Sequence, residues 1–186
     1  MNKISILNIV NDTTVDGPGF RTAIYASGCV HQCKGCHNPQ SWVMENGIMY
    51  SVDQLLNIIK DNEFANVTFS GGDPLVQVEG FTDLARRIKN ETNKNIWCYT
   101  GFSYEYILKL GKLSAILPFI DVLVDGKYIE HLRKDNLQFR GSRNQRIIDV
   151  QKSLLARQVV IWGTAHDSQQ FEVLQPQGQA CIESRY

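Results

Sequence analysis

Residues 20–36, FRTAIYASGCVHQCKGC, join a run of aromatic and β-branched residues to three closely spaced cysteines. The run at 20–27 predicts a β-strand, because such residues favour extended structure and Gly28 punctuates its end. The strand leads directly into a loop that carries Cys29, Cys33 and Cys36. Crowded cysteines of this kind indicate metal binding or redox chemistry rather than disulfides in a cytosolic protein.

The chain downstream alternates between two kinds of predicted element. Three segments have the apolar spacing of amphipathic helices: residues 51–61, 78–90 and 103–110. Three short apolar runs predict strands: residues 66–69, 95–101 and 121–126. Two further runs are candidates for additional strands: residues 146–150 and 158–162. Alternation of this kind implies βαβ units, and therefore an α/β fold with a parallel sheet.

Each predicted strand is followed by a polar or glycine-rich segment. These segments are the cysteine loop at 29–36, Ser-Gly-Gly-Asp-Pro at 70–74, Tyr-Thr-Gly at 99–101 and Asp-Gly-Lys at 125–127. Ligands bind beyond the carboxyl ends of the strands in parallel α/β folds. We therefore expect these segments to gather on one rim of the sheet.

Composition limits the class of protein. Lys plus Arg and Asp plus Glu both number 19, so no basic field predicts binding to nucleic acid or to an anionic membrane. No stretch approaches the ~20 apolar residues that span a bilayer, and the N-terminus lacks the pattern of a signal peptide. We expect a cytoplasmic protein with one core domain at residues 1–162 and a flexible C-terminal tail at 163–186.

The cysteines have two readings. Three thiolates can hold three irons of a 4Fe–4S cluster, whose remaining iron then needs a ligand from elsewhere. The alternative is a structural zinc site with His31 or His37 as the last ligand. The eight residues of the loop leave both readings open, although a single ion bound by such close neighbours would strain the loop.

Two turn motifs allow a functional and a plain reading. The adjacent Gly71 and Gly72 let the backbone approach a ligand closely, but a tight turn after a strand has the same composition. Asp-Gly-Pro-Gly-Phe-Arg at 16–21 reads as a hairpin-like bend from its spacing alone. Cys98, in the middle of a predicted strand, reads as a buried structural thiol.

Taken together, the motifs resemble the radical S-adenosylmethionine (SAM) superfamily. CxxxCxxC at 29–36 is its signature, and Gly-Gly-Asp-Pro at 71–74 is similar to its glycine motif. Within the superfamily the chain is most similar to the glycyl-radical-enzyme activases. Three stretches carry this similarity over about residues 10–150: DGPGFR at 16–21, DVLVDGKY at 121–128 and RGSRNQR at 140–146.

The resemblance implies a partial (βα)6 barrel of parallel strands, open on one side, with a 4Fe–4S cluster and SAM as cofactors. A reduced flavodoxin-type donor would supply an electron that cleaves SAM. The resulting 5′-deoxyadenosyl radical would take hydrogen from a glycine of the large subunit of an anaerobic ribonucleoside-triphosphate reductase. The alternatives are a radical SAM enzyme acting on a small molecule, such as a 7-carboxy-7-deazaguanine synthase, and a non-enzymatic iron–sulfur or zinc module.

The resemblance also assigns site residues. Cys29, Cys33 and Cys36 would ligate the cluster. The SAM contacts would be Gly71, Gly72 and Asp73 at the methionine amino group, Gly35 and His37 beside the adenine, and Asp125 and Lys127 elsewhere on SAM. Two departures from the family pattern concern the adenine and ribose contacts: Gly35 stands where many members have an aromatic residue, and no carboxylate follows the strand near Tyr99.

Overall fold

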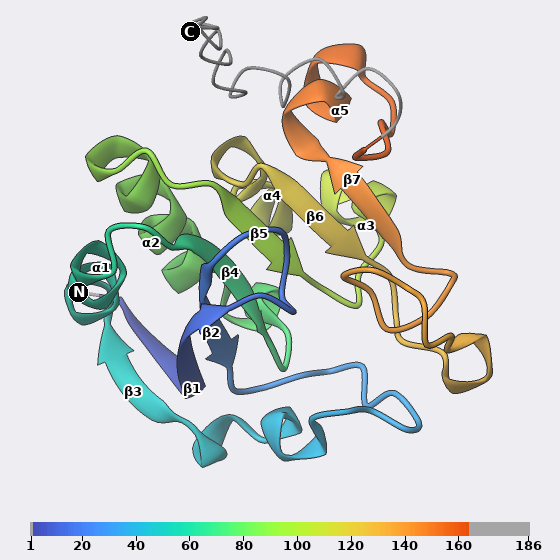
Figure 1. The fold of residues 1–186 in the computed structure, drawn as a ribbon, viewed down its shortest axis with the longest axis horizontal. Coiled ribbons are helices and arrows are strands. Elements are labelled where there is room, and N and C mark those ends of the chain that lie inside the picture. Colours follow the sequence, from blue (N-terminus) through green and yellow to red (C-terminus); the bar gives the residue numbers. More distant parts are fainter. Residues whose placement is uncertain (1, 164–186) are drawn as a thin grey trace, which may run out of the picture.

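The structure, a computed structural model, describes residues 2–163. Seven strands form one sheet in the order β3-β1-β2-β4-β5-β6-β7 (Figure 1). The strands are β1 (Lys3–Thr13), β2 (Arg21–Ala26), β3 (Ile48–Ser51), β4 (Asn66–Gly71), β5 (Ile96–Tyr99), β6 (Val122–Asp125) and β7 (Arg146–Asp149). The helices are α1 (Val52–Asp61), α2 (Val78–Glu91), α3 (Tyr104–Lys109), α4 (Gly111–Ser114) and α5 (Val150–Ala156). Short 3-10 turns are η1 (Pro39–Trp42), η2 (Met44–Asn46), η3 (Pro74–Gln77), η4 (Leu117–Phe119) and η5 (Glu130–Leu132).

The centre of the sheet is parallel, as the sequence predicts. Strands β2, β4, β5 and β6 pair in parallel, each with the next in chain order. Successive right-handed crossovers place their helices on one face of a sheet and curve it toward a barrel. The sheet is open, with β3 and β7 at its two edges (Figure 1). This α/β arrangement is consistent with a partial radical SAM barrel.

Both edges of the sheet are antiparallel, which corrects the expectation of parallel strands there. Strand β1 pairs antiparallel with β2 and β3, and β7 pairs antiparallel with β6. Sequence analysis did not predict β1 or β3, because polar residues such as Asn8 interrupt the β1 pattern and its pairing with β2 contains register shifts. The candidate strand at 158–162 is reduced to a single bridge between Ile161 and Ile148.

The predicted helices form for the reasons that their patterns indicate. Ser51 and Gln54 make the reciprocal capping-box hydrogen bonds at the start of α1. Helices α1 and α2 contact one another, and both bury their apolar positions in the main core. No helix within residues 2–163 is long and apolar enough to cross a membrane. The predicted tail at 163–186 lies, apart from Gly163, outside the described residues.

The two faces of the sheet have different cores. The face under the helices carries the main core, where the rings of Phe69 and Phe81 lie 5.0 Å apart and Cys98 is fully buried, as predicted. Burial raises the pKa of the Cys98 thiol well above its usual value. Side chains alternate along a strand, so Trp97 points to the other face, where its ring contacts those of Phe139 and Trp162.

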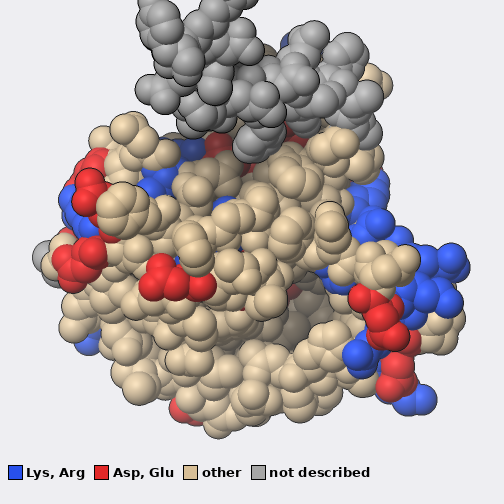
Figure 2. Space-filling view, viewed as in Figure 1, with Lys and Arg blue, Asp and Glu red and all other residues tan. Residues whose placement is uncertain are grey.

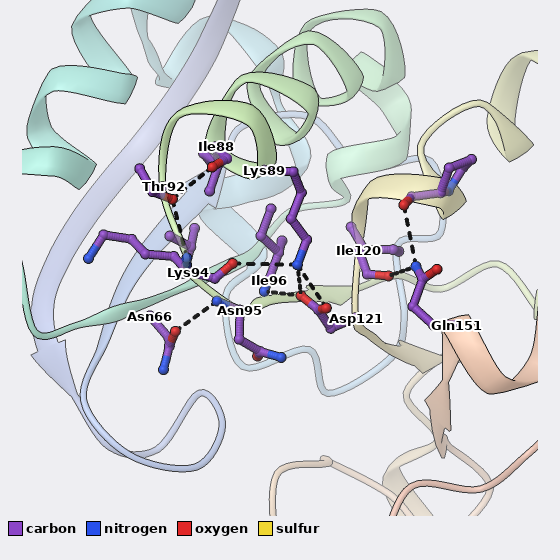
Figure 3. Close-up of polar contacts among 12 residues, drawn as sticks. Asn66, Ile88, Lys89, Thr92, Lys94, Asn95, Ile96, Ile120, Asp121 and Gln151 are labelled. Carbon is purple, nitrogen blue, oxygen red and sulfur yellow. Dashed lines mark hydrogen bonds and ion pairs between the residues drawn. The ribbon is translucent and has the colours of Figure 1, made fainter.

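The amino ends of β5 and β6 are joined by polar contacts (Figure 3). Nζ of Lys89 lies 2.8 and 2.7 Å from the two carboxylate oxygens of Asp121. The same carboxylate accepts a hydrogen bond from the Ile96 amide at 2.7 Å. These contacts connect α2 to both strands at the edge of the sheet opposite the carboxyl ends.

Candidate functional site

The polar segments predicted to share a rim do gather there. A cavity of about 440 Å³ lies at the carboxyl ends of the parallel strands. Figure 2 shows that this face of the molecule is hollowed. Its lining includes residues from each predicted segment, among them Cys29, Cys33, Cys36, Gly72, Thr100 and Gly126. One site therefore collects the three thiols, the glycine turn and the ends of β5 and β6.

The cysteine loop is held by main-chain contacts with the η1 turn. The Gly28 amide donates to the carbonyl of Ser41 at 2.7 Å, and the Cys29 amide donates to that of Trp42 at 3.0 Å. All three thiols of the loop are partly exposed. Burial raises the pKa of the Cys29 thiol. Binding of a metal to this sulfur would release the proton.

The donor set fits an iron–sulfur cluster. Cys29, Cys33 and Cys36 all border one cavity, and soft thiolates are the usual ligands of such clusters. Within residues 2–163, no three His, Cys, Asp or Glu side chains converge closely enough for one metal ion. A cubane cluster does not need that convergence, because each thiolate binds a different iron.

Asp73 lies behind the rim, fully buried. Its carboxylate accepts hydrogen bonds from the Thr100 hydroxyl at 2.9 and 3.0 Å, from the Gly101 amide at 2.9 Å and from the Leu75 amide at 2.9 Å. Nε2 of His31 lies 2.9 Å from the same carboxylate. Protein groups therefore surround Asp73, which is not among the cavity-lining residues, and it connects the cysteine loop to the ends of β4 and β5.

Close approach of the chain requires both glycines of the turn. Gly71 has φ +99°, and a Cβ there would lie 2.5 Å from the Ala26 amide nitrogen. A Cβ on Gly72 would collide with the carbonyl oxygen of Gly28. The Gly72 amide donates to the carbonyl of Ala26 at 2.8 Å. The turn therefore lies directly against the strand that leads into the cysteine loop, and both glycines line the cavity.

Gly35 and His37 lie on the flank of the cysteine loop that faces the chain after β6. Gly35 has φ +71°, and a Cβ there would lie 2.6 Å from Oε1 of Glu130. A larger side chain at this position would be strained by the positive φ, and the exposed Glu130 side chain would have to move aside. The ring of His37 instead lies 4.9 Å from that of Tyr128, and both residues line the cavity. Sequence analysis did not single out Tyr128, although it lies in the DVLVDGKY stretch.

The structure places neither Asp125 nor Lys127 in the lining of this cavity. Asp125 is buried and accepts hydrogen bonds from the Tyr104 amide at 2.8 Å and from Nε of Arg146 at 3.0 Å. Lys127 is exposed and borders a neighbouring hollow with Val30.

The turn motif at 16–21 ends in a buried arginine, Arg21, which attaches the turn to the sheet. This arginine is 1% exposed, and its guanidinium donates to Thr68 Oγ1 at 2.6 Å and lies 5.5 Å from the centre of the Trp97 ring. Burial lowers its pKa to about 10. The turn that Arg21 anchors brings Asp16 to the cavity, where its carboxylate accepts a hydrogen bond from the Tyr25 hydroxyl at 2.8 Å.

Tyr25 and Asp16 are site residues that sequence reasoning missed. Both line the cavity, and burial raises the pKa of Tyr25 so that the phenol stays protonated as a donor to Asp16. The only signal in the sequence was the turn motif itself. Tyr25 is the one residue of β2 that is not fully buried, and no alternation along the strand indicates which face its side chain takes.

Comparison with known proteins agrees with this geometry. Residues 15–148 match a family model described as a 4Fe–4S single cluster domain. The chain is 39% identical over 139 residues to the anaerobic ribonucleoside-triphosphate reductase-activating protein of Haemophilus influenzae, covering 70% of this chain and 88% of that protein. The protein of the same name from Vibrio cholerae gives the same values. The one from Enterobacteria phage T4 is 35% identical over 139 residues, which cover 72% of this chain and 86% of the relative.

Proposed function

This chain belongs to the family of anaerobic ribonucleoside-triphosphate reductase-activating proteins, and we propose that it installs a glycyl radical on a reductase of that class. It is a radical SAM enzyme whose cofactors are a 4Fe–4S cluster and SAM. The observation that carries the proposal is the meeting of three thiols and a two-glycine turn in one cavity. A cytoplasmic location is part of the proposal, because the thiols must stay reduced to bind iron.

Cys29, Cys33 and Cys36 would hold the cluster on the side of the cysteine loop that lines the cavity. When bound, the cluster and SAM supply a one-electron cleavage that yields a 5′-deoxyadenosyl radical. We assign the electron to a reduced flavodoxin-type donor. The protein's own contribution is to orient the two cofactors and to exclude water from the cavity.

The glycine turn is suited to the methionine end of SAM. Gly71 and Gly72 line the cavity without side chains, so their main-chain groups can lie within hydrogen-bond reach of an amino group. Asp73 would act here by holding the turn against the cysteine loop, since its carboxylate is already bonded to Thr100 and Gly101.

The opposite wall is suited to the adenine. His37 and Tyr128 present a pair of rings on the cavity lining, and Gly35 lets the loop pass close to Glu130. Asp125 would support this region indirectly by pairing with Arg146, and Lys127 would act at the neighbouring hollow. The reaction would thus take place between the glycine turn after β4 and a wall that combines the cysteine loop after β2 with Tyr128 after β6.

The test uses reconstituted protein in the absence of oxygen. Reduced flavodoxin or dithionite, SAM and the reductase are mixed, and a glycyl radical is sought by electron paramagnetic resonance while 5′-deoxyadenosine is quantified. We expect a radical with the native reductase and none with a reductase in which Ala replaces the target glycine. Formation of 5′-deoxyadenosine only after a small molecule is added, with no protein radical, would favour the small-molecule alternative.

A further inference from the structure

The chain between β6 and β7 is rich in basic residues. We call residues 127–143 the basic segment; it holds five basic residues, Lys127, Arg133, Lys134, Arg140 and Arg143, against two acidic ones, Glu130 and Asp135. The whole chain has a net charge of zero, so this is a local concentration. Lys and Arg side chains, with some Asp and Glu among them, gather at the right-hand edge of the face in Figure 2, where Figure 1 places the connection between β6 and β7.

The RGSRNQR motif at 140–146 overlaps the end of the basic segment, and several of its residues make contacts that hold the fold together. Oε1 of Gln145 accepts hydrogen bonds from the amides of Gly141 and Ser142 at 2.8 and 3.1 Å, which closes the turn on itself. Nε2 of Gln145 donates to the carbonyl of Gly126 at 2.9 Å. The guanidinium of Arg146 pairs with Glu105 and Asp125. These contacts fix the C-terminal end of the basic segment beside the end of β6.

Besides Lys127, which borders the neighbouring hollow, three cations of the basic segment are not used in this way. Arg133, Lys134 and Arg143 are exposed, and none of them forms an ion pair with a carboxylate among the described residues. The segment is also continuous with the site, because Arg140 and Gly141 line the cavity. Unpaired positive charge therefore stands next to the opening through which a protein substrate would have to reach the reacting atoms.

We propose that the basic segment is a docking surface for an acidic stretch of the partner reductase close to its target glycine; this rests on the proposed function. Complementary charge at the rim of an interface speeds association and sets its orientation. A loop that carries the target glycine needs such an orientation, since it must enter the cavity in one register. Three free cations beside a cavity suit a short acidic peptide better than nucleic acid, whose binders spread many phosphate contacts along a basic stripe.

The test compares two full-length variants that carry the same change in charge. The first is Arg133→Glu, Lys134→Glu and Arg143→Glu. The matched control is Lys3→Glu, Lys109→Glu and Arg157→Glu, at exposed positions outside the basic segment. Both are loaded with the cluster, and the affinity for the purified reductase is measured by calorimetry over a series of salt concentrations.

We expect the basic-segment variant to bind the reductase at least about tenfold more weakly than the wild type at low salt, with the gap narrowing as salt screens the charges. The control should bind like the wild type. The rate of SAM cleavage, with dithionite as the electron source and no reductase present, should be equal in all three proteins. Equal rates would show that the cavity is intact.

Equal affinity of the wild type and the basic-segment variant would overturn the proposal and leave the proposed function standing. An equal loss in the control would overturn it too, because net charge rather than this surface would then be responsible. Loss of binding to single-stranded DNA with unchanged reductase affinity would identify a nucleic-acid site instead. A wild type that neither binds the reductase nor forms a glycyl radical would refute the proposed function itself.

Discussion

Nε2 of His31 lies 2.9 Å from Oδ2 of Asp73, so the loop between the first two cysteines is attached to the turn after β4. The ring of His31 also contacts Phe102, at 4.5 Å between ring centres. The two motifs that mark this family are therefore bonded to one another inside the protein. An acidic residue in the glycine turn serves this attachment even when no cofactor is bound.

Replacing Asp73 with Ala should destabilise the fold. The substitution would leave the Thr100 hydroxyl and the Gly101 amide without their acceptor in a buried place. We expect a loss of about 2–4 kcal/mol in the free energy of unfolding, measured by urea denaturation of the metal-free protein. Asp83→Ala, which removes only a surface pair with Arg86, should cost less than about 1 kcal/mol. Equal losses in the two variants would contradict the attachment.

Replacing Gly72 with Ala should disturb the site through its backbone. A Cβ would press on the carbonyl oxygen of Gly28, which belongs to the main chain and has little freedom to yield. We expect a loss of about 1–3 kcal/mol, together with a lower iron content after reconstitution. The control is Gly111→Ala, because a Cβ on Gly111 meets open space. Full iron loading and wild-type stability in Gly72→Ala would show that the turn can relax.

Replacing any one of Cys29, Cys33 or Cys36 with Ala should prevent stable assembly of the cluster. Each thiolate would bind a separate iron, so no remaining residue of the set can substitute for a lost one. Analysis of the reconstituted wild type should give about four iron and about four sulfide per chain. Cys98→Ala is the control: its thiol is buried in the main core, so iron content should stay unchanged. Stoichiometric zinc without sulfide in the wild type would support the structural zinc site.

The ion pair of Glu105 and Arg146 should stabilise the fold in a pH-dependent way. Hydrogen bonding to Arg146 lowers the pKa of Glu105 from 4.5 to about 2. A lowered folded-state pKa means that the stabilisation is fully present above pH 4.5 and is lost as the pH falls toward 2. Because the carboxylate is half exposed, Glu105→Gln should cost at most about 1 kcal/mol at pH 7.

The pH dependence is tested by comparing the wild type with Glu105→Gln and with a control variant. Denaturation of the metal-free wild type and of Glu105→Gln, measured from pH 7 down to about pH 3, should give a difference that shrinks as Glu105 becomes protonated. Glu45→Gln serves as the control, because this exposed carboxylate of η2 forms no ion pair with Arg146. A constant difference across the range would mean that Arg146 does not hold the Glu105 carboxylate.

Local pattern was enough to predict the parallel core. Helix α1 is capped by Ser51 because its capping box needs only Ser51 and Gln54, three positions apart, and β2 and β4 follow from short apolar runs. Strands β1 and β3 were missed for a physical reason. Their pairing joins residues such as Ile4 and Tyr50, and neither segment has a clean alternation that would reveal it alone.

The site was predictable where chemistry follows a strand in sequence. The cysteines and the Gly71–Gly72 turn could be brought together because carboxyl ends of parallel strands share an edge. Arg21 and Tyr128 could not be found in this way. Arg21 is buried against Trp97, and Tyr128 meets His37, through contacts that depend on how the whole sheet curves.

The cysteine loop takes its shape from protein contacts on three sides: Gly28 bonds to Ser41, His31 to Asp73, and Gly35 lies against Glu130. The main core contains none of the three cysteines. In small zinc domains, by contrast, the metal itself drives folding. We therefore expect iron to be inserted as the last step of maturation, after the cysteine loop has already folded. A molecule stripped of iron by air should be repaired by reloading, without having to refold.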